Sequence, residues 1–119
     1  MNATSYLIVL NDAPYGSERV YNGLRLAGSL ARRENLAVKV FLLGDGASGA
    51  KANQRVPSGY YNVQNMLAAV TKHGGEVGVC GTCMDARGIA AEELAEGARR
   101  STLEELTDWV ATSDRVLVF

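Results

Sequence analysis

The chain has 119 residues, of which 47% are hydrophobic, and this suits one globular domain with its own core. Its 12 basic and 13 acidic side chains give a formal net charge of -1, so no overall field favours nucleic acid or anionic lipid. The amino-terminal segment lacks the basic start and apolar length of a signal peptide, and no apolar run approaches the roughly 20 residues that cross a bilayer. We therefore expect a cytoplasmic protein with no membrane partner and no nucleic acid as its main ligand.

A strand and a helix are expected first. Residues 6–10 are continuously apolar, as in a parallel strand that is covered on both faces. A polar turn over residues 11–16 follows, and Ser17 is expected to cap the next helix. Apolar residues at steps of four, three and four indicate that helix: Val20, Leu24, Ala27 and Ala31.

The middle of the chain predicts a strand over residues 38–43, followed by a polar, glycine-rich stretch from Gly44 to Gly59. Loops of this length are usually functional, mobile or partly helical, so we expect a flap over a site or an interface. The stretch opens on a GxGxxG pattern, but it follows the second strand and starts no amphipathic helix, so we do not interpret it as a dinucleotide site. Asn62 then caps a second helix, which stops at residues 73–75.

The second half begins with a strand over residues 76–79, which brings Cys80 to its carboxyl end. A short helix or turn and a short strand are expected before Arg100. The pair Thr102 and Glu105 matches a capping box. It precedes an apolar stripe of Leu103, Leu106, Trp109 and Val110, and residues 115–119 predict the last strand. This alternation favours right-handed crossovers and an α/β fold with a mostly parallel sheet of about five strands.

The cysteine pair Cys80-Gly81-Thr82-Cys83 is the main candidate site. Turns after parallel strands meet at one edge of a sheet, and ligands bind there near a switch in strand order. A helix amino terminus or a nearby cation favours the reactive thiolate. Gly81 lets the backbone approach a ligand, and Thr82 is expected to cap a helical turn that begins at Cys83. Arg87, one helical turn after Cys83, is a candidate to steady an anionic sulfur.

The turn after the first strand should reach the same edge, so Tyr15 and Gly16 are candidates for substrate binding. Tyr60 and Tyr61 also fall in a predicted loop near it. Aromatic side chains at such a place line a pocket or a subunit interface, and the sequence leaves both open.

Other interpretations of the two cysteines also remain. Both fit small buried hydrophobic residues, because free cysteine is among the most buried residue types. A zinc site needs four ligands, and His73 is the only further soft ligand in the chain. We therefore predict no metal, and we predict no cofactor.

Three segments resemble a known family: residues 11–18 (NDAPYGSE), residues 79–89 with the pattern CxxCxDxRGI, and residues 101–119. Over essentially its whole length, 1–119, the chain resembles the small YchN-type branch of the DsrE/DsrF-like proteins. The resemblance implies a single flavodoxin-like domain, a three-layer sandwich, assembled as a homotrimer or homohexamer. Relatives in the wider family relay sulfur as a cysteine persulfide, on a cysteine whose position Cys80 matches. Cys83 belongs to the narrower branch.

The leading hypothesis is thus a sulfur carrier or sulfurtransferase, in which Cys80 takes sulfur from a donor and a partner's thiol accepts it. Cys83 would resolve the persulfide or form a reversible disulfide. A dithiol-disulfide oxidoreductase is the second hypothesis, although Pro14 and Pro57 both precede the motif, whereas thioredoxin-like proteins carry a cis-proline after it. The third is a non-enzymatic oligomeric binding module. The sequence identifies neither the sulfur donor nor the acceptor.

Overall fold

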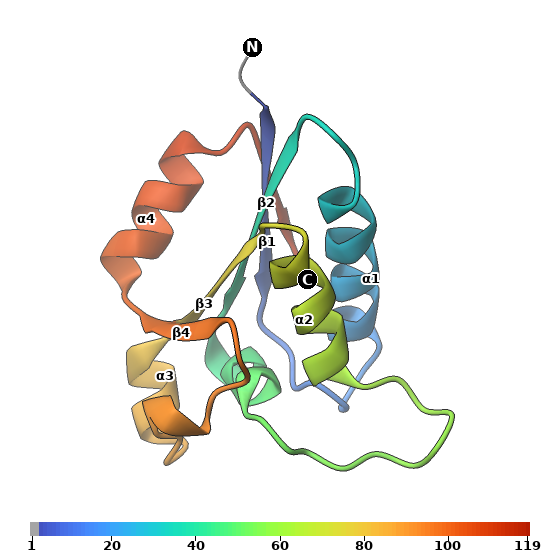
Figure 1. The fold of residues 1–119 in the computed structure, drawn as a ribbon. Coiled ribbons are helices and arrows are strands. Elements are labelled where there is room, and N and C mark those ends of the chain that lie inside the picture. The colour runs from blue at the N-terminus through green and yellow to red at the C-terminus, as the bar shows by residue number, and fades with distance from the viewer. Residues whose placement is uncertain (1–2) are drawn as a thin grey trace.

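A computed structural model describes residues 3–119, and five parallel strands form its centre (Figure 1). The order across the sheet is β4-β3-β2-β1-β5, and every neighbouring pair is parallel. In chain order the strands are β1 (Thr4–Leu10), β2 (Leu36–Leu42), β3 (Glu76–Cys80), β4 (Ala98–Ser101) and β5 (Arg115–Val118). The predicted α/β class is confirmed, and the sheet is parallel throughout.

Helices complete a three-layer arrangement (Figure 1). One face of the sheet carries α1 (Arg19–Ala31) and α2 (Val63–Lys72), and the other carries α4 (Leu103–Thr112). Three short elements lie at the carboxyl ends of the strands: η1 (Gly44–Ala50), α3 (Gly81–Ala86) and η2 (Ala91–Glu93). The strand order differs from the 2-1-3-4-5 order of flavodoxin itself, so the likeness to flavodoxin lies in the layers.

Each face of the sheet has its own apolar core. Ile8 of β1 lies in the larger core beneath α1 and α2, whereas its neighbour Leu7 lies in a smaller core beneath α4. In the smaller core Phe41 packs edge-on against Trp109, with ring centroids 6.0 Å apart. Adjacent residues of a strand point to opposite faces, so the continuous apolar run in β1 fills both cores.

The predicted helix starts are partly confirmed. Asn62 caps α2 as expected, with its side-chain oxygen accepting from the backbone N–H of Asn65 at 3.0 Å. The prediction that Ser17 caps α1 is wrong by one residue, because Glu18 occupies the cap position and makes no side-chain hydrogen bond there. The Ser17 hydroxyl still accepts from the backbone N–H of Arg19, at 3.3 Å, while it donates to the carboxylate of Asp12 at 2.7 Å.

The start of α4 shows half of the predicted capping box. The Thr102 hydroxyl accepts from the backbone N–H of Glu105 at 3.2 Å, but the Glu105 carboxylate bonds Arg99 and Ser101. The predicted apolar stripe is wrong at Leu103 and Val110, which are 70% and 45% exposed. The reason is that α4 contacts the smaller core mainly through Trp109 and Leu106.

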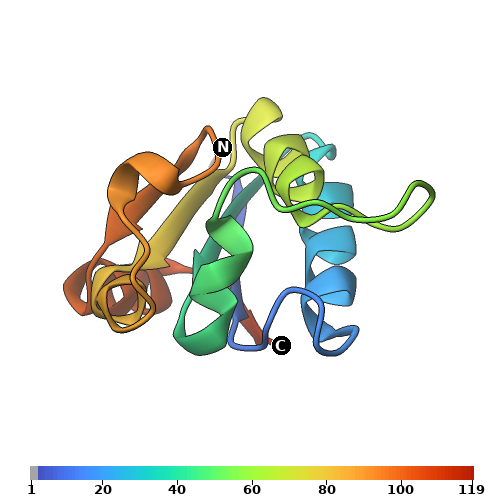
Figure 2. The ribbon, with the colours of Figure 1, turned by 90° about the horizontal axis from the view of Figure 1, so that it is seen from below.

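The glycine-rich stretch is partly helical, as one of the three expectations for it allowed. Gly44 opens η1 with a φ of +60°, and the backbone N–H of Gly46 donates to the carbonyl oxygens of Asn11 and Leu43, both at 3.1 Å. These bonds fasten η1 across the carboxyl ends of β1 and β2. The remainder of the loop extends away from the sheet before α2 begins (Figure 2). Within residues 3–119 no helix has the length and apolar character needed to cross a membrane.

Gly46→Ala should destabilise the protein by about 1–3 kcal/mol, because a Cβ at this position would lie 2.3 Å from the carbonyl oxygen of Leu10. Urea unfolding measures the change. Gly28→Ala in α1 is the matched control: its Cβ would meet only the flexible Arg32 guanidinium, at 4.0 Å, so it should stabilise by up to about 1 kcal/mol. A Gly46→Ala variant as stable as the wild type would contradict this close approach.

Candidate functional site

The candidate site lies where β3 and β4 end side by side. Cys80, the last residue of β3, is the register partner of Ser101, the last residue of β4. From β1 to β4 the chain moves across the sheet in one direction, and after β4 it returns by way of α4 to β5 at the far side of β1. The switch in strand order therefore lies between β1 and β5. The ends of β3 and β4 share with it the carboxyl edge of the sheet, along which α/β proteins bind ligands.

Cys80 caps α3 with its own sulfur. The Sγ atom accepts from the backbone N–H of Cys83 at 3.4 Å and lies 3.4 Å from the hydroxyl oxygen of Thr82. The prediction that Thr82 caps a turn starting at Cys83 is therefore wrong, because α3 already begins at Gly81. The Thr82 hydroxyl instead lies against the Cys80 sulfur.

These contacts favour the thiolate of Cys80. Partial burial raises the pKa of the thiol, but hydrogen bonds from the side chains of Cys83 and Thr82, and from their backbone amides, outweigh it. The net result is a pKa below the ordinary cysteine value, because donors directed at a sulfur stabilise its negative charge. Of the two thiols, Cys80 is therefore the one that ionises more readily.

Cys83 has the opposite tendency. Burial and the hydrogen bond to Cys80 raise the pKa of the Cys83 thiol, while the Gly44 amide and the charge of Arg87 lower it by less. Its Sγ accepts from the backbone N–H of Gly44 at 3.1 Å. Cys83 also packs against the core beneath α1 and α2, whereas Cys80 packs against the core beneath α4. The two thiols thus differ in how readily they ionise, and they lie on opposite sides of the sheet edge.

Arg87 is held away from Cys80. Its guanidinium donates twice to one carboxylate oxygen of Asp45, at 2.7 and 3.2 Å, and once to the carbonyl oxygen of Cys83, at 3.0 Å. Its charge lowers the pKa of Cys83 and is not among the causes that lower the pKa of Cys80. Arg87 therefore joins α3 to η1, and its predicted effect on an anionic sulfur applies to Cys83.

Arg100 is the cation that the sequence reasoning missed. Its guanidinium lies so close to Gly81 that a Cβ there would be 2.8 Å from the guanidinium carbon. Asp85 binds it through both carboxylate oxygens, at 2.8 and 3.0 Å. The Asp85 pair is the main reason for the raised pKa of Arg100, and Cys80 adds a smaller contribution. Only the parallel register of β4 with β3 reveals this neighbour, because β4 is short, polar and hard to predict.

Cys80 opens into an apolar hollow of about 350 Å³ between the sheet and the start of α4. The lining residues contributed by β2 and α4 are apolar, and those next to the strand ends are polar. They are Phe41, Leu43, Thr82, Arg100, Ser101, Thr102, Leu103 and Leu106. Cys83 is not among them, so the hollow belongs to the thiol whose pKa is lowered.

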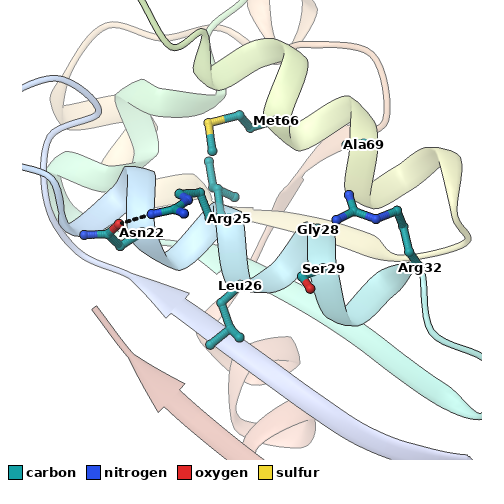
Figure 3. Close-up of a pocket in the computed structure, with 9 residues that line it drawn as sticks. Asn22, Arg25, Leu26, Gly28, Ser29, Arg32, Met66 and Ala69 are labelled. Atoms are coloured by element: carbon teal, nitrogen blue, oxygen red, sulfur yellow. Dashed lines mark hydrogen bonds between the residues drawn. The ribbon is translucent and has the colours of Figure 1, made fainter.

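A larger hollow, of about 600 Å³, lies elsewhere (Figure 3). It is a groove between α1 and α2, in which side chains such as Arg25 and Arg32 of α1 approach Met66 and Ala69 of α2. Neither cysteine lines this groove, and α1 and α2 cover the face of the sheet opposite α4. Size alone therefore does not locate the chemistry, and we assign the candidate site to the smaller hollow.

The structure does not bring Tyr15 to the cysteines. Its ring packs with those of Tyr60 and Tyr61, at centroid distances of 6.1 and 5.3 Å, and its hydroxyl accepts from the backbone N–H of Val63 at 3.0 Å. Gly16 lies in the same turn, where an added Cβ would meet that of Ala13 at 3.3 Å. These contacts place the turn beside α2, and substrate binding by Tyr15 and Gly16 stays a prediction.

Metal binding finds no support in the side-chain arrangement. Among residues 3–119, no three histidine, cysteine or acidic side chains are grouped so as to hold a metal ion. His73 lies at the carboxyl end of α2 as its cap residue.

The fold and the strand-end thiols define a class of small α/β proteins with a cysteine pair at the carboxyl edge of a parallel sheet. The model of the DsrE/DsrF-like family matches residues 4–119, and the chain belongs to this family. It is 42% identical over 114 residues to protein YchN of Escherichia coli, covering 95% of this chain and 97% of the relative. The crystal structure of E. coli ychN protein superposes with a TM-score of 0.91 at 41% identity, covering 98% and 99% of the two chains.

A more distant relative has a name that bears on function. The sulfurtransferase TusD homolog of Vibrio vulnificus is 24% identical over an alignment of 131 positions that spans the whole of both chains. The family and the fold class predicted from the sequence are both confirmed by these comparisons.

Alkylation at a series of pH values should separate the two thiols. In a Cys83→Ser variant the reaction of Cys80 with iodoacetamide should reach its midpoint at lower pH than the reaction of Cys83 in a Cys80→Ser variant, because the pKa of Cys80 is lowered and that of Cys83 is raised. Mass spectrometry follows each reaction. The reverse order of midpoints would assign the nucleophile to Cys83.

Proposed function

We propose that this protein is a sulfur carrier that holds sulfane sulfur as a persulfide on Cys80. The observation that carries the proposal is the Cys80 sulfur itself, which ends β3, accepts from the Cys83 amide and opens into a hollow. Membership of the DsrE/DsrF-like family and the sulfurtransferase name of a relative support it. A cytoplasmic setting, where thiols stay reduced, is part of the proposal.

The transfer needs no external oxidant. The Cys80 thiolate attacks the outer sulfur of a donor persulfide, R–S–SH. A new S–S bond forms at Cys80, the donor's S–S bond breaks, and the donor leaves as the thiolate R–S⁻. The thiol of Cys83, whose pKa is raised, then supplies a proton to this leaving group. An acceptor thiolate attacks the same outer sulfur in the second half of the cycle and restores the Cys80 thiolate.

Cys83 also provides a route by which the persulfide on Cys80 is broken down. Once deprotonated, its sulfur can attack the inner sulfur at Cys80, which releases hydrosulfide and leaves a Cys80–Cys83 disulfide. The amide of Cys83 lies 3.4 Å from the Cys80 sulfur, which makes the two cysteine side chains neighbours and favours this attack. A cellular thiol would reduce the disulfide. The second cysteine thus limits how long sulfur stays bound.

Incubation with inorganic polysulfide should add the mass of one sulfur atom to the wild-type protein, at Cys80. Cys80→Ser should abolish the addition, whereas Cys83→Ser should retain it and prolong its lifetime, because the resolving thiol is gone. Peptide mass spectrometry under non-reducing conditions measures both. An unmodified Cys80 across inorganic and organic persulfide donors would refute the carrier function.

A dithiol-disulfide oxidoreductase is the second candidate, favoured by the same contact between the Cys83 amide and the Cys80 sulfur. Rapid reduction of insulin disulfides that depends on Cys80, without persulfide formation, would favour this candidate over the carrier.

We also propose that the protein forms a homotrimer or homohexamer. Val116 and Val118 of the edge strand β5 are 37% and 66% exposed, and they point to the side of α4 because Leu117 between them packs in the opposite core. An open strand edge with apolar side chains favours association with another chain.

Val118→Lys should lower the assembly mass measured by sedimentation, because it places a charge in the proposed contact. Ala68→Lys, at an exposed position of α2 on the other side of the sheet, is the matched control and should leave the mass unchanged. A monomeric wild-type protein at micromolar concentration would refute the assembly.

A further inference from the structure

The hollow in front of Cys80 has mostly apolar walls. Phe41 of β2 forms part of its floor, Leu103 and Leu106 come from the first turns of α4, and Leu43 follows β2. Its volume of about 350 Å³ is at the lower end of the range for small-molecule sites. A compound that reaches the Cys80 sulfur therefore removes apolar protein surface from water as it enters.

The polar groups of the hollow are engaged within the protein. Among the described lining residues one is charged, Arg100, and both carboxylate oxygens of Asp85 bind it. The Ser101 hydroxyl donates to the Glu105 carboxylate, and the Thr102 hydroxyl accepts from the Glu105 amide. An anionic ligand would lose its hydration without finding a cation that is not already paired, and a cationic ligand would find only the Cys80 sulfur, the atom that has to react.

We propose that this hollow is a subsite for the carbon part of a small sulfur compound, an uncharged aliphatic or aromatic thiol or its persulfide, that exchanges sulfur with Cys80. The inference rests on the proposed carrier function and names its substrate class. A peptide acceptor would need a contact on the order of 800 Å² on each partner, whereas an alkyl or benzyl group needs only the hollow. In the exchange, Cys80–S⁻ and R–S–SH give Cys80–S–SH and R–S⁻, with R held between Leu43, Leu103 and Leu106.

Alkyl methanethiosulfonates of increasing chain length probe the subsite. With Cys83→Ser as the background, Cys80 is the only thiol. Its thiolate attacks the alkyl-bearing sulfur, forms Cys80–S–S–R and releases methanesulfinate. Rates measured by stopped flow, each divided by the rate for free cysteine, should rise by roughly two- to fourfold for each added methylene until the hollow is filled.

Charged reagents distinguish binding in an apolar subsite from simple electrostatic attraction to the thiolate. The sulfonatoethyl and trimethylammonioethyl reagents should both react more slowly than the methyl reagent after the same normalisation, because either charge must be desolvated. A site governed by charge alone would slow one and speed the other, and that result would overturn the proposal.

One exposed leucine and one exposed valine of α4 provide matched variants. Leu103→Ser removes a wall of the hollow and should flatten the dependence on chain length. Val110→Ser, on the same helix but outside the lining, should preserve it. Equal slopes in the two variants would contradict the assignment of the subsite.

Polysulfide loading of the wild-type protein distinguishes failure of the subsite proposal from failure of the proposed carrier function. Persulfide at Cys80 together with a flat chain-length profile would overturn the subsite and leave the carrier function standing. A steep profile without persulfide from any donor would overturn the function and leave the subsite. Reactivity that is low towards every reagent and recovers on dilution would show that a second copy of the chain covers the hollow, which also overturns the proposal.

Discussion

The hydrogen bond from the backbone N–H of Cys83 to the sulfur of Cys80 links the fold to its chemistry. A helix leaves its first amides without partners, and α3 satisfies one of them with a sulfur where most helices use an oxygen. The same bond stabilises negative charge on that sulfur. The start of the helix and the lowered pKa of the thiol therefore share this contact, to which the side chains of Cys83 and Thr82 add further hydrogen bonds.

Around this contact the two faces of the sheet differ in how completely they are covered. Beneath α1 and α2 lies a large core to which Cys83 adds its side chain, and the Gly44 amide holds its sulfur. Beneath α4 the core is smaller, and the helix leaves space between its first turn and the end of β3. The hollow lies where α4, which contacts the smaller core mainly through Trp109 and Leu106, leaves the end of β3 uncovered. Incomplete packing on one face thus provides the working space for Cys80.

The sequence predicts the features that depend on neighbouring residues. The apolar runs of β1 and β2, the Asn62 cap and the arrival of Cys80 at a strand end follow from local patterns, and the structure confirms them. Ser17 and Thr82 have the right chemistry for caps, but each lies one or two residues from the position where the backbone leaves an amide free.

Features that depend on strand register escape prediction. Arg100 approaches Gly81 only because β4 pairs with β3, and the four residues of β4 form too short and polar a signal. The hollow is likewise invisible in the sequence, because Leu103 and Leu106 look like ordinary core positions of an amphipathic helix. The family resemblance supplies the fold and the cysteine, while the cation and the apolar walls come from the structure.

Main-chain groups provide much of what holds the two sulfurs: the amide of Cys83 at one and the amide of Gly44 at the other. A backbone donor stays in place whatever side chain its residue carries, provided that the local path of the chain is kept. Substitutions at Leu43, Leu103 or Leu106 can therefore alter which compounds reach Cys80 while the contacts that lower its pKa persist. The fold separates the source of reactivity from the source of selectivity, an arrangement that leaves substrate choice open to gradual change.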